Sequence, residues 1–256
     1  MIQILNKRAS NHPNHCEDSY FIHEDDEVIV GAVLDGCSTG IESHFASQFI
    51  KYALENGIRY YSKKKFNFTD DEQLLDALVL DCHKYLDITK DLLGLSEMNF
   101  LSTMVVLVYS KGESRLTVKF WGDGSIFVTD KNDLTVRFDN DEGNAPQYLA
   151  YYTPNKPETY DYFSSRVTKT FNDVKSFSIC TDGIDSLVNL KNPHVNREVA
   201  INHLLYSDKF KTQKLGLSKR FSQLTNRFDD LKLSEELFYW DIKDDLTIIH
   251  FYDETI

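Results

Sequence analysis

The chain has 256 residues, of which 41% are apolar and 13% aromatic, a composition that supports a substantial core and argues against disorder. Its 28 basic and 40 acidic residues give a net charge of -12, and so acidic a surface argues against nucleic acid as a partner. The four dispersed cysteines include no C-x-x-C pair, and no segment resembles a signal peptide or a bilayer-spanning run. We therefore expect a reduced, cytoplasmic protein with no membrane partner.

The first part of the chain is predicted to form strands and then two helices. Alternating or continuous apolar residues predict strands over 2–5, 19–23 and 28–34. Apolar residues at helical spacing then predict a helix over 39–56 that ends at Gly57, and a second helix over 71–93.

Strand patterns return in the second half of the chain. Segments 115–121 and 125–129 flank Gly122-Asp123-Gly124, which indicates a hairpin. The other predicted elements are strands over 103–109, 134–138, 166–171, 175–181 and 246–252, helices within 195–240, and an irregular, flap-like segment at about 139–165. This order predicts a mixed, mainly antiparallel α+β fold, and we expect one domain over 1–256.

Several carboxylates fall at the ends of the predicted strands, where loops project side chains from a rigid scaffold. Asp35 and Asp182 each follow a strand and precede a glycine. The others are Glu17 and Asp18 before the second strand, Asp123 in the predicted turn, and Asp244 and Asp245 before the last strand. Each has an ordinary explanation on its own, because Asp-Gly is a common turn dipeptide. Together they supply the oxygen ligands that Mg²⁺ and Mn²⁺ prefer.

Taken in order, these segments resemble the type 2C (PPM) family of metal-dependent serine/threonine protein phosphatases. The Ser10-Asn11-His12 element and the stretch 144–151 resemble its bacterial-type branch. The matching segments are Cys16-Glu17-Asp18-Ser19, Val33-Leu34-Asp35-Gly36, Ser102-Thr103-Met104-Val105-Val106, Trp121-Gly122-Asp123-Gly124-Ser125, Ser178-Ile179-Cys180-Thr181-Asp182-Gly183 and Asp244-Asp245-Leu246-Thr247-Ile248-Ile249. The resemblance implies a four-layer α-β-β-α sandwich, with two antiparallel sheets flanked by helices. It also implies a signalling enzyme that hydrolyses phosphoserine or phosphothreonine in a protein, opposed by a kinase acting in trans.

The resemblance further implies a site for two Mn²⁺ or Mg²⁺ ions, with a weaker third position. In that scheme Asp35 bridges the two ions, the Gly36 carbonyl and Glu17 bind one of them, Asp182 and Asp244 bind the other, Asp18 acts through water, and Asp123 joins Asp182 at the third position. A pair of such ions activates a water molecule and holds the phosphate during in-line attack.

Two departures from the family pattern bear on catalysis. No arginine stands just before the first acidic motif to grip the substrate phosphate, so His12 or Ser10 is expected to take that contact, ahead of Arg8. Cys37 stands where many relatives carry a general-acid histidine, so a metal-bound water or His12 is expected to protonate the leaving group. The predicted catalytic residues are thus His12, Asp35 and Asp182.

Other phosphatase classes and one non-enzymatic function were weighed against this prediction. Cysteine-dependent phosphatases need C-x-x-x-x-x-R, and the sixth residues after the cysteines are Ile22, Ser43, Ile88 and Ser186. The remaining alternative is a pseudophosphatase that keeps the fold to bind a phosphoprotein or another partner. The missing arginine and histidine favour it, whereas the retained carboxylates favour the enzyme.

Overall fold

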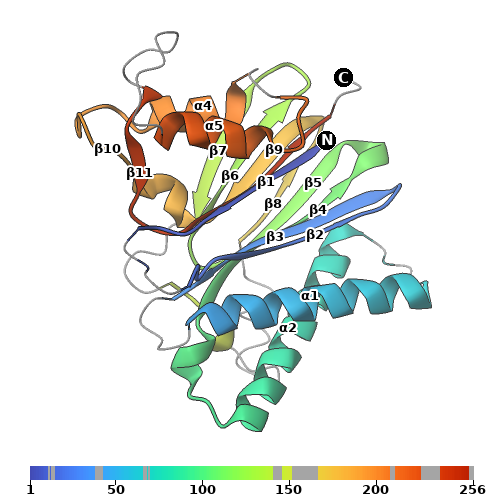
Figure 1. Cartoon of the computed structure of the whole chain (residues 1–256). Coiled ribbons are helices and arrows are strands. Elements are labelled where there is room, and N and C mark those ends of the chain that lie inside the picture. Colours follow the sequence, from blue (N-terminus) through green and yellow to red (C-terminus); the bar gives the residue numbers. More distant parts are fainter. Residues whose placement is uncertain are drawn as a thin grey trace.

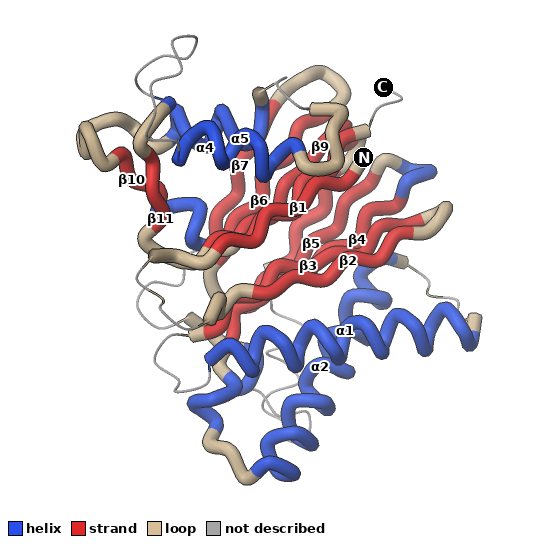
Figure 2. Tube along the Cα trace, in the orientation of Figure 1, coloured by secondary structure: helices blue, strands red, loops and turns tan. Residues whose placement is uncertain are grey.

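The computed structural model of the chain consists of two antiparallel sheets that lie face to face, with helices over both outer faces (Figure 1). It describes all residues except 11, 13, 14, 38–42, 66, 67, 69, 141–145, 152–166, 208–210, 226–236 and 254–256. The layer order helix, sheet, sheet, helix is plain when the trace is coloured by secondary structure (Figure 2). The predicted α+β, four-layer sandwich is therefore confirmed. None of the described helices is long and apolar enough to cross a membrane.

The first sheet has the strand order β2-β3-β4-β5-β8 and is covered by two long helices. Its strands are β2 (Ser19–Glu24), β3 (Val28–Gly36), β4 (Ser102–Ser110), β5 (Arg115–Trp121) and β8 (Thr168–Phe171). Helices α1 (Ser43–Lys64) and α2 (Asp71–Leu93) pack on its outer face. Helix α2 begins where Asp70 accepts a hydrogen bond from the backbone N–H of Gln73 and ends at Gly94 in the left-handed conformation, which is standard capping.

The second sheet has the order β1-β12-β9-β6-β7 and is covered by two shorter helices. Its strands are β1 (Ile2–Lys7), β6 (Gly124–Asp130), β7 (Thr135–Asn140), β9 (Val174–Cys180) and β12 (Leu246–Tyr252). Helices α4 (Glu198–Tyr206) and α5 (Gly216–Thr225) lie over it. A short pair, β10 (Leu187–Asn189) and β11 (Trp240–Ile242), had no expected counterpart in the sequence.

The hydrophobic core has three layers, one between the sheets and one beneath each pair of helices. In β3, Ile29 and Val33 face the second sheet, while Val30 and Leu34 face α1 and α2. Both faces of the strand are thus buried, which explains why its sequence is a continuous apolar run rather than an alternating one.

Two expectations about local structure were wrong. Gly122-Asp123-Gly124 does not close a hairpin, because β5 belongs to the first sheet and β6 to the second, so this turn carries the chain across the sandwich. Gly57 does not end α1, which continues to Lys64. A Cβ at position 57 would lie 3.1 Å from Leu78 of α2, so the glycine serves the close approach of the two helices.

The flap-like segment predicted at about 139–165 is described only in part. Residues 139 and 140 end β7, and Leu149–Tyr151 form a 3₁₀ turn. Residues 141–145 and 152–166 lie outside the described part of the chain. Whether residues 1–256 form one domain stays a prediction.

Candidate metal centre

The two sheets bring the ends of several strands to one edge of the sandwich. In the first sheet, the end of β3 lies beside the start of β2, with Leu34 opposite Ser19. In the second sheet, the end of β9 lies beside the start of β12, with Cys180 opposite Ile248. The loops at these strand ends carry the predicted ligands Glu17, Asp18, Asp35, Gly36, Asp182 and Asp244, and Asp123 lies in the crossing between β5 and β6.

Asp18 is buried in a network of hydroxyl groups that links the two sheets. Its Oδ2 accepts a 2.8 Å hydrogen bond from the Thr181 hydroxyl, and the Thr181 Oγ1 accepts one of 3.0 Å from the backbone N–H of Thr247. Burial raises the pKa of Asp18 to about 8, although hydrogen bonds from Thr181 and Thr247 act in the opposite direction. Its Oδ1 is buried without a hydrogen-bond partner. One oxygen of Asp18 is thus oriented by the protein, and the other remains for a ligand.

Asp35 lies at the end of β3, on the same strand face as Val33, which points between the sheets. Burial raises its pKa well above the usual value, and the neighbouring carboxylates of Asp18, Asp182 and Asp244 raise it further. The negative charges of Asp18, Asp182 and Asp244 thus act on Asp35. Such a group of carboxylates is costly unless it is protonated or binds cations.

Asp182 shares this acidic environment from the second sheet. Asp182 is exposed at its surface side, and its partial desolvation, with the charges of Asp244, Asp123 and Asp185, raises its pKa to about 6. Asp244 is held by the neighbouring turn, since the Ser186 hydroxyl accepts its backbone N–H at 3.1 Å and donates to the Gly183 carbonyl at 2.8 Å. Asp123 and Asp182 line the same cavity.

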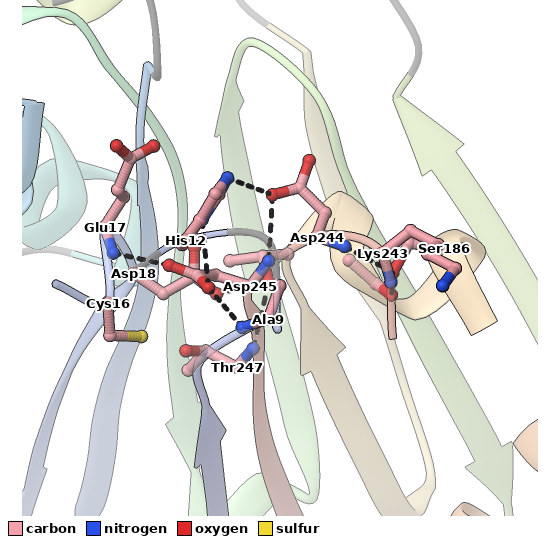
Figure 3. A network of polar contacts seen from close by, with 12 residues as sticks. Ala9, His12, Cys16, Glu17, Asp18, Ser186, Lys243, Asp244, Asp245 and Thr247 are labelled. Atoms are coloured by element: carbon pink, nitrogen blue, oxygen red, sulfur yellow. Dashed lines mark hydrogen bonds and ion pairs between the residues drawn. The ribbon is translucent and has the colours of Figure 1, made fainter. Parts of the chain in front are cut away.

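Glu17 and Gly36 meet through the backbone. The Gly36 N–H donates to the Glu17 carbonyl at 3.3 Å, and the Ser47 hydroxyl of α1 donates to the same carbonyl at 2.6 Å. This fixes the chain on both sides of the Glu17 side chain. Figure 3 shows the Glu17 and Asp244 carboxylates on the same side of the site, with the His12 ring between them.

His12 does lie in the cluster, and it is positioned by Asp245, a residue that received no role from the sequence. Its Nδ1 is 3.1 Å from Oδ1 of Asp245, and its Nε2 is 3.9 Å from Oδ1 of Asp244 (Figure 3). Burial favours a lower pKa for His12, but the hydrogen bond and charge of Asp245, with Glu17 and Asp244, raise it overall. The raised pKa favours the protonated form of His12 beside Asp245 and Asp244.

Asp245 also organises the backbone of the N-terminal loop. It is 1% exposed, and it accepts the backbone N–H of Ala9 at 2.6 Å and that of Glu17 at 2.5 Å.

A cysteine and a tyrosine adjoin Asp35 and were not paired by sequence reasoning. The Tyr148 hydroxyl and the Cys37 thiol form a hydrogen bond, and burial, followed by this bond, raises the pKa of Tyr148. Tyr148 comes from the described part of the predicted flap-like segment. Its phenol therefore stays protonated beside the site and is able to donate a hydrogen bond.

A cavity of about 580 Å³ opens beside Asp182 and Asp123, and it contains two arginines. The Arg137 guanidinium binds both carboxylate oxygens of Asp185, at 2.8 and 2.9 Å, and contacts Glu198 at 3.2 Å. Arg197 donates to the Asp185 carbonyl. These arginines are near the acids, but their charges are already matched by carboxylates.

The carboxylates of this site are suitable ligands for divalent cations. The described side chains do not, however, converge on a single ion position. No group of three or more His, Cys, Asp or Glu side chains in the described part of the chain is arranged to hold a metal ion. A cation would nevertheless relieve two unfavourable features. The buried Oδ1 of Asp18 has no hydrogen-bond partner, and the negative charges of Asp18 and Asp182 act on Asp35. The donor set is oxygen, which suits Mg²⁺ and Mn²⁺.

The sequence model of the family described as Protein phosphatase 2C matches residues 7–237. The chain belongs to this family. No curated protein matches the sequence significantly. Solved 2C phosphatase structures share the fold. RsbX in complex with magnesium is 19% identical, with a TM-score of 0.55 and 98% of both chains covered.

Two further solved structures agree with this family. The catalytic domain of the serine/threonine phosphatase PstP in complex with 2 manganese ions is 14% identical, with a TM-score of 0.63 over 98% of this chain and 96% of that one. The SiaA-PP2C domain of Pseudomonas aeruginosa is 13% identical, with a TM-score of 0.59 over 99% and 86%. At these identities the likeness concerns the fold.

Proposed function

We propose that the chain is a protein phosphatase that hydrolyses phosphoserine and phosphothreonine with Mn²⁺ or Mg²⁺ as its cofactor. The observation that carries this proposal is the environment of Asp35, a half-buried carboxylate on which the charges of Asp18, Asp182 and Asp244 act. Cations make such an arrangement favourable, and family membership supports the same chemistry. The substrate is then a phosphoprotein, and the opposing kinase is a separate protein.

In this proposal the chain's carboxylates hold two ions, with a weaker third. Asp35 would contribute to both ions, Glu17 and the Gly36 carbonyl would hold one of them, and Asp182 with Asp244 would hold the other. Asp123 contributes to the third position, and Asp18 acts through water. When bound, such ions would supply Lewis acidity and make a water molecule a better nucleophile toward the phosphate.

The remaining chemistry falls to side chains around the ions. His12, held by Asp245, is placed to contact the phosphate or to give a proton to the leaving alkoxide. The Thr181 hydroxyl holds the Asp18 carboxylate in place, so a water molecule bound to Asp18 would have a defined position. The described part of the flap-like segment adds Tyr148 beside Cys37, where it borders the approach of a phosphoprotein.

The second candidate is a pseudophosphatase that binds a phosphoprotein without hydrolysing it. Two observations favour it: the described ligands are not converged, and Cys37 occupies the place of the general-acid histidine. The two candidates differ in turnover, since a binding module needs neither the metal nor an activated water.

The test is hydrolysis of p-nitrophenyl phosphate and of a phosphothreonine peptide with Mn²⁺, with Mg²⁺ and with EDTA. Asp182→Asn is the test variant, and Asp173→Asn is its matched control, because Asp173 is 70% exposed in the turn between β8 and β9. Turnover that requires metal and is lost only in Asp182→Asn supports the enzyme. Metal binding by a folded protein without turnover on either substrate supports the pseudophosphatase.

A further inference from the structure

Arg137, on the edge strand β7, joins three segments of the second half of the chain through one guanidinium. Its Nη2 binds both carboxylate oxygens of Asp185, its Nε donates to Oδ1 of Asp139 at 2.7 Å, and its Nη1 donates to Oε1 of Glu198 at 3.2 Å. Asp185 belongs to the 3₁₀ turn η4 (Asp182–Ser186), and Glu198 is the first residue of α4. The guanidinium thus connects the strand, a turn that begins with a predicted metal ligand, and the start of the helix.

The Arg137 side chain is also fixed from the strand side. In the pairing of β6 with β7, Arg137 lies opposite Phe127, and its Cζ is 5.0 Å from the centre of that buried ring. Asp139 lies opposite Ser125, whose hydroxyl donates to Oδ1 of Asp139 at 2.6 Å. The same oxygen accepts from Arg137. A buried aromatic ring and an anchored carboxylate therefore give the planar guanidinium a defined direction.

The turn η4 links Asp185 to two predicted metal ligands. Asp185 also contacts a second arginine, since Arg197 donates from Nη1 to its carbonyl at 2.8 Å and lies with Nη2 3.3 Å from its Oδ1. The next residue, Ser186, accepts the backbone N–H of Asp244 at 3.1 Å (Figure 3). Asp182 is the first residue of the same turn. The positions of both Asp182 and Asp244 therefore depend on where this turn lies.

The contacts of Arg137 indicate a positioning role and not a direct contact with phosphate. Its Nε, Nη1 and Nη2 each donate to a carboxylate. Arg137 and Asp185 line the cavity of about 580 Å³ that also contains Asp123 and Asp182, so the pair lies beside the predicted ligands. A bidentate pair of arginine and carboxylate sets both a distance and a direction, which suits it to hold a turn in one place.

We propose that Arg137 is a positioning residue for the metal ion expected at Asp182 and Asp244. This inference rests on the metal site of the proposed function, but it concerns the binding of the ion and not the hydrolysis step. Arg137 holds η4 before an ion arrives, so the two carboxylates lose less conformational freedom when they bind it. Residues that orient metal ligands without touching the metal change metal affinity about 10–100-fold when they are replaced.

The test is isothermal titration calorimetry of the whole, metal-stripped chain with Mn²⁺, together with urea denaturation of each variant. Asp182→Asn identifies the binding step that belongs to this ion. Arg137→Lys is the test variant, because lysine keeps the positive charge near the cations but loses the planar fork. A change in affinity then reports on positioning and not on the repulsion between Arg137 and the ion.

Arg115→Lys is the matched control, because Arg115 is also an ion-paired arginine on a strand. Its Nε contacts Asp71 at 2.9 Å, its Nη1 contacts Glu113, and its side chain is 31% exposed, against 22% for Arg137. Arg115 begins β5, whose other end, Trp121, leads into the turn that carries Asp123. At about 3.3 Å per residue, Arg115 is roughly 20 Å from that end of the strand.

We expect the binding step that is lost in Asp182→Asn to be weakened about ten-fold in Arg137→Lys and to stay within two-fold in Arg115→Lys. The urea midpoint should fall in both arginine variants. Phe127→Leu is a second variant that changes no charge. It removes the ring beside the guanidinium and should weaken the same step about three-fold.

The outcomes separate this inference from the proposed function. Wild-type affinity for Mn²⁺ in Arg137→Lys, or an equal loss of affinity in Arg137→Lys and Arg115→Lys, would overturn the positioning role and leave the metal site in place. Failure of the folded wild-type protein to bind Mn²⁺, or equal binding by Asp182→Asn, would overturn the metal site and the positioning role together.

Discussion

A Cβ atom on Gly183 would lie 1.8 Å from the carbonyl oxygen of Asp245, so the backbones at these two positions are in direct contact. Gly183 follows Asp182 at the end of β9, and Asp245 follows Asp244 at the start of β12. The contact therefore sets how close the two predicted ligands, Asp182 and Asp244, come to each other. The glycine is required here by close approach and not by its backbone angles.

Gly183→Ala is expected to destabilise the protein by about 3 kcal/mol or more, because backbone atoms must move to admit the methyl group. Metal-dependent turnover should be lost with it, since the two loops would separate. Gly112→Ala is the matched control, because nothing lies within 4 Å of a Cβ at that position, and a change within about 0.5 kcal/mol is expected there. Urea denaturation measures the free energy of unfolding of both variants. Equal unfolding midpoints for the two would contradict the role given to Gly183.

Asp245→Ala is expected to cost about 2–4 kcal/mol, because it leaves the backbone N–H groups of Ala9 and Glu17 without their acceptor. It also releases His12 and Glu17, so Mg²⁺ should bind more weakly. Asp26→Ala, in the exposed loop between β2 and β3, controls for loss of a carboxylate. Thermal unfolding with and without Mg²⁺ measures both effects. A variant as stable as Asp26→Ala would remove the structural role assigned to Asp245.

Most strands were predictable because their apolar patterns are long and each face is buried. The bounds of β5, α2 and β12 match the sequence prediction. The path through Gly122-Asp123-Gly124 was not predictable, since a turn of this composition serves a hairpin and a crossing between sheets equally well. The pair β10 and β11 was missed because three-residue strands carry too little pattern.

The candidate site was predictable as a set of carboxylates but not as a network. Asp18 and Asp244 were identified from their motifs, yet neither the tie of Asp18 to Thr181 nor the role of Asp245 follows from local sequence. Such contacts join residues more than 160 positions apart and depend on the register between β9 and β12. The pairing of Cys37 with Tyr148 is of the same kind.

The metal-free protein is expected to become less stable as pH rises from about 4 to 8. Burial raises the pKa of Asp18 to about 8 and that of Asp182 to about 6, above the usual value of 3.8. Over this range the unfolded chain releases protons that the folded chain retains, so the free energy of unfolding falls. Asp18→Asn should flatten the dependence, because an amide does not titrate.

Saturating Mg²⁺ should reverse this loss, because cations favour the ionised carboxylates, and a concentration of about 100 Kd adds about 2.7 kcal/mol. Urea midpoints at pH 5 and pH 7.5, with EDTA or Mg²⁺, measure the effect in wild type and Asp18→Asn. Identical pH slopes for the two proteins in EDTA would show that Asp18 does not titrate as described.

Tyr148→Phe is expected to change the handling of a phosphopeptide more than that of p-nitrophenyl phosphate. The substitution removes the hydrogen bond to Cys37 and keeps the ring, whose edge meets Tyr151 at a centroid distance of 5.5 Å. A neutral hydrogen bond is worth about 1 kcal/mol, so kcat/KM for a phosphothreonine peptide should fall about five-fold. Tyr151→Phe is the control, because Tyr151 is 45% exposed in the 3₁₀ turn Leu149–Tyr151 that directly follows Tyr148. The small aryl substrate does not reach across the flap-like segment, so its turnover should stay within two-fold.

A parallel loss on both substrates would place Tyr148 at the reacting phosphate, and no loss on either would leave it a packing residue.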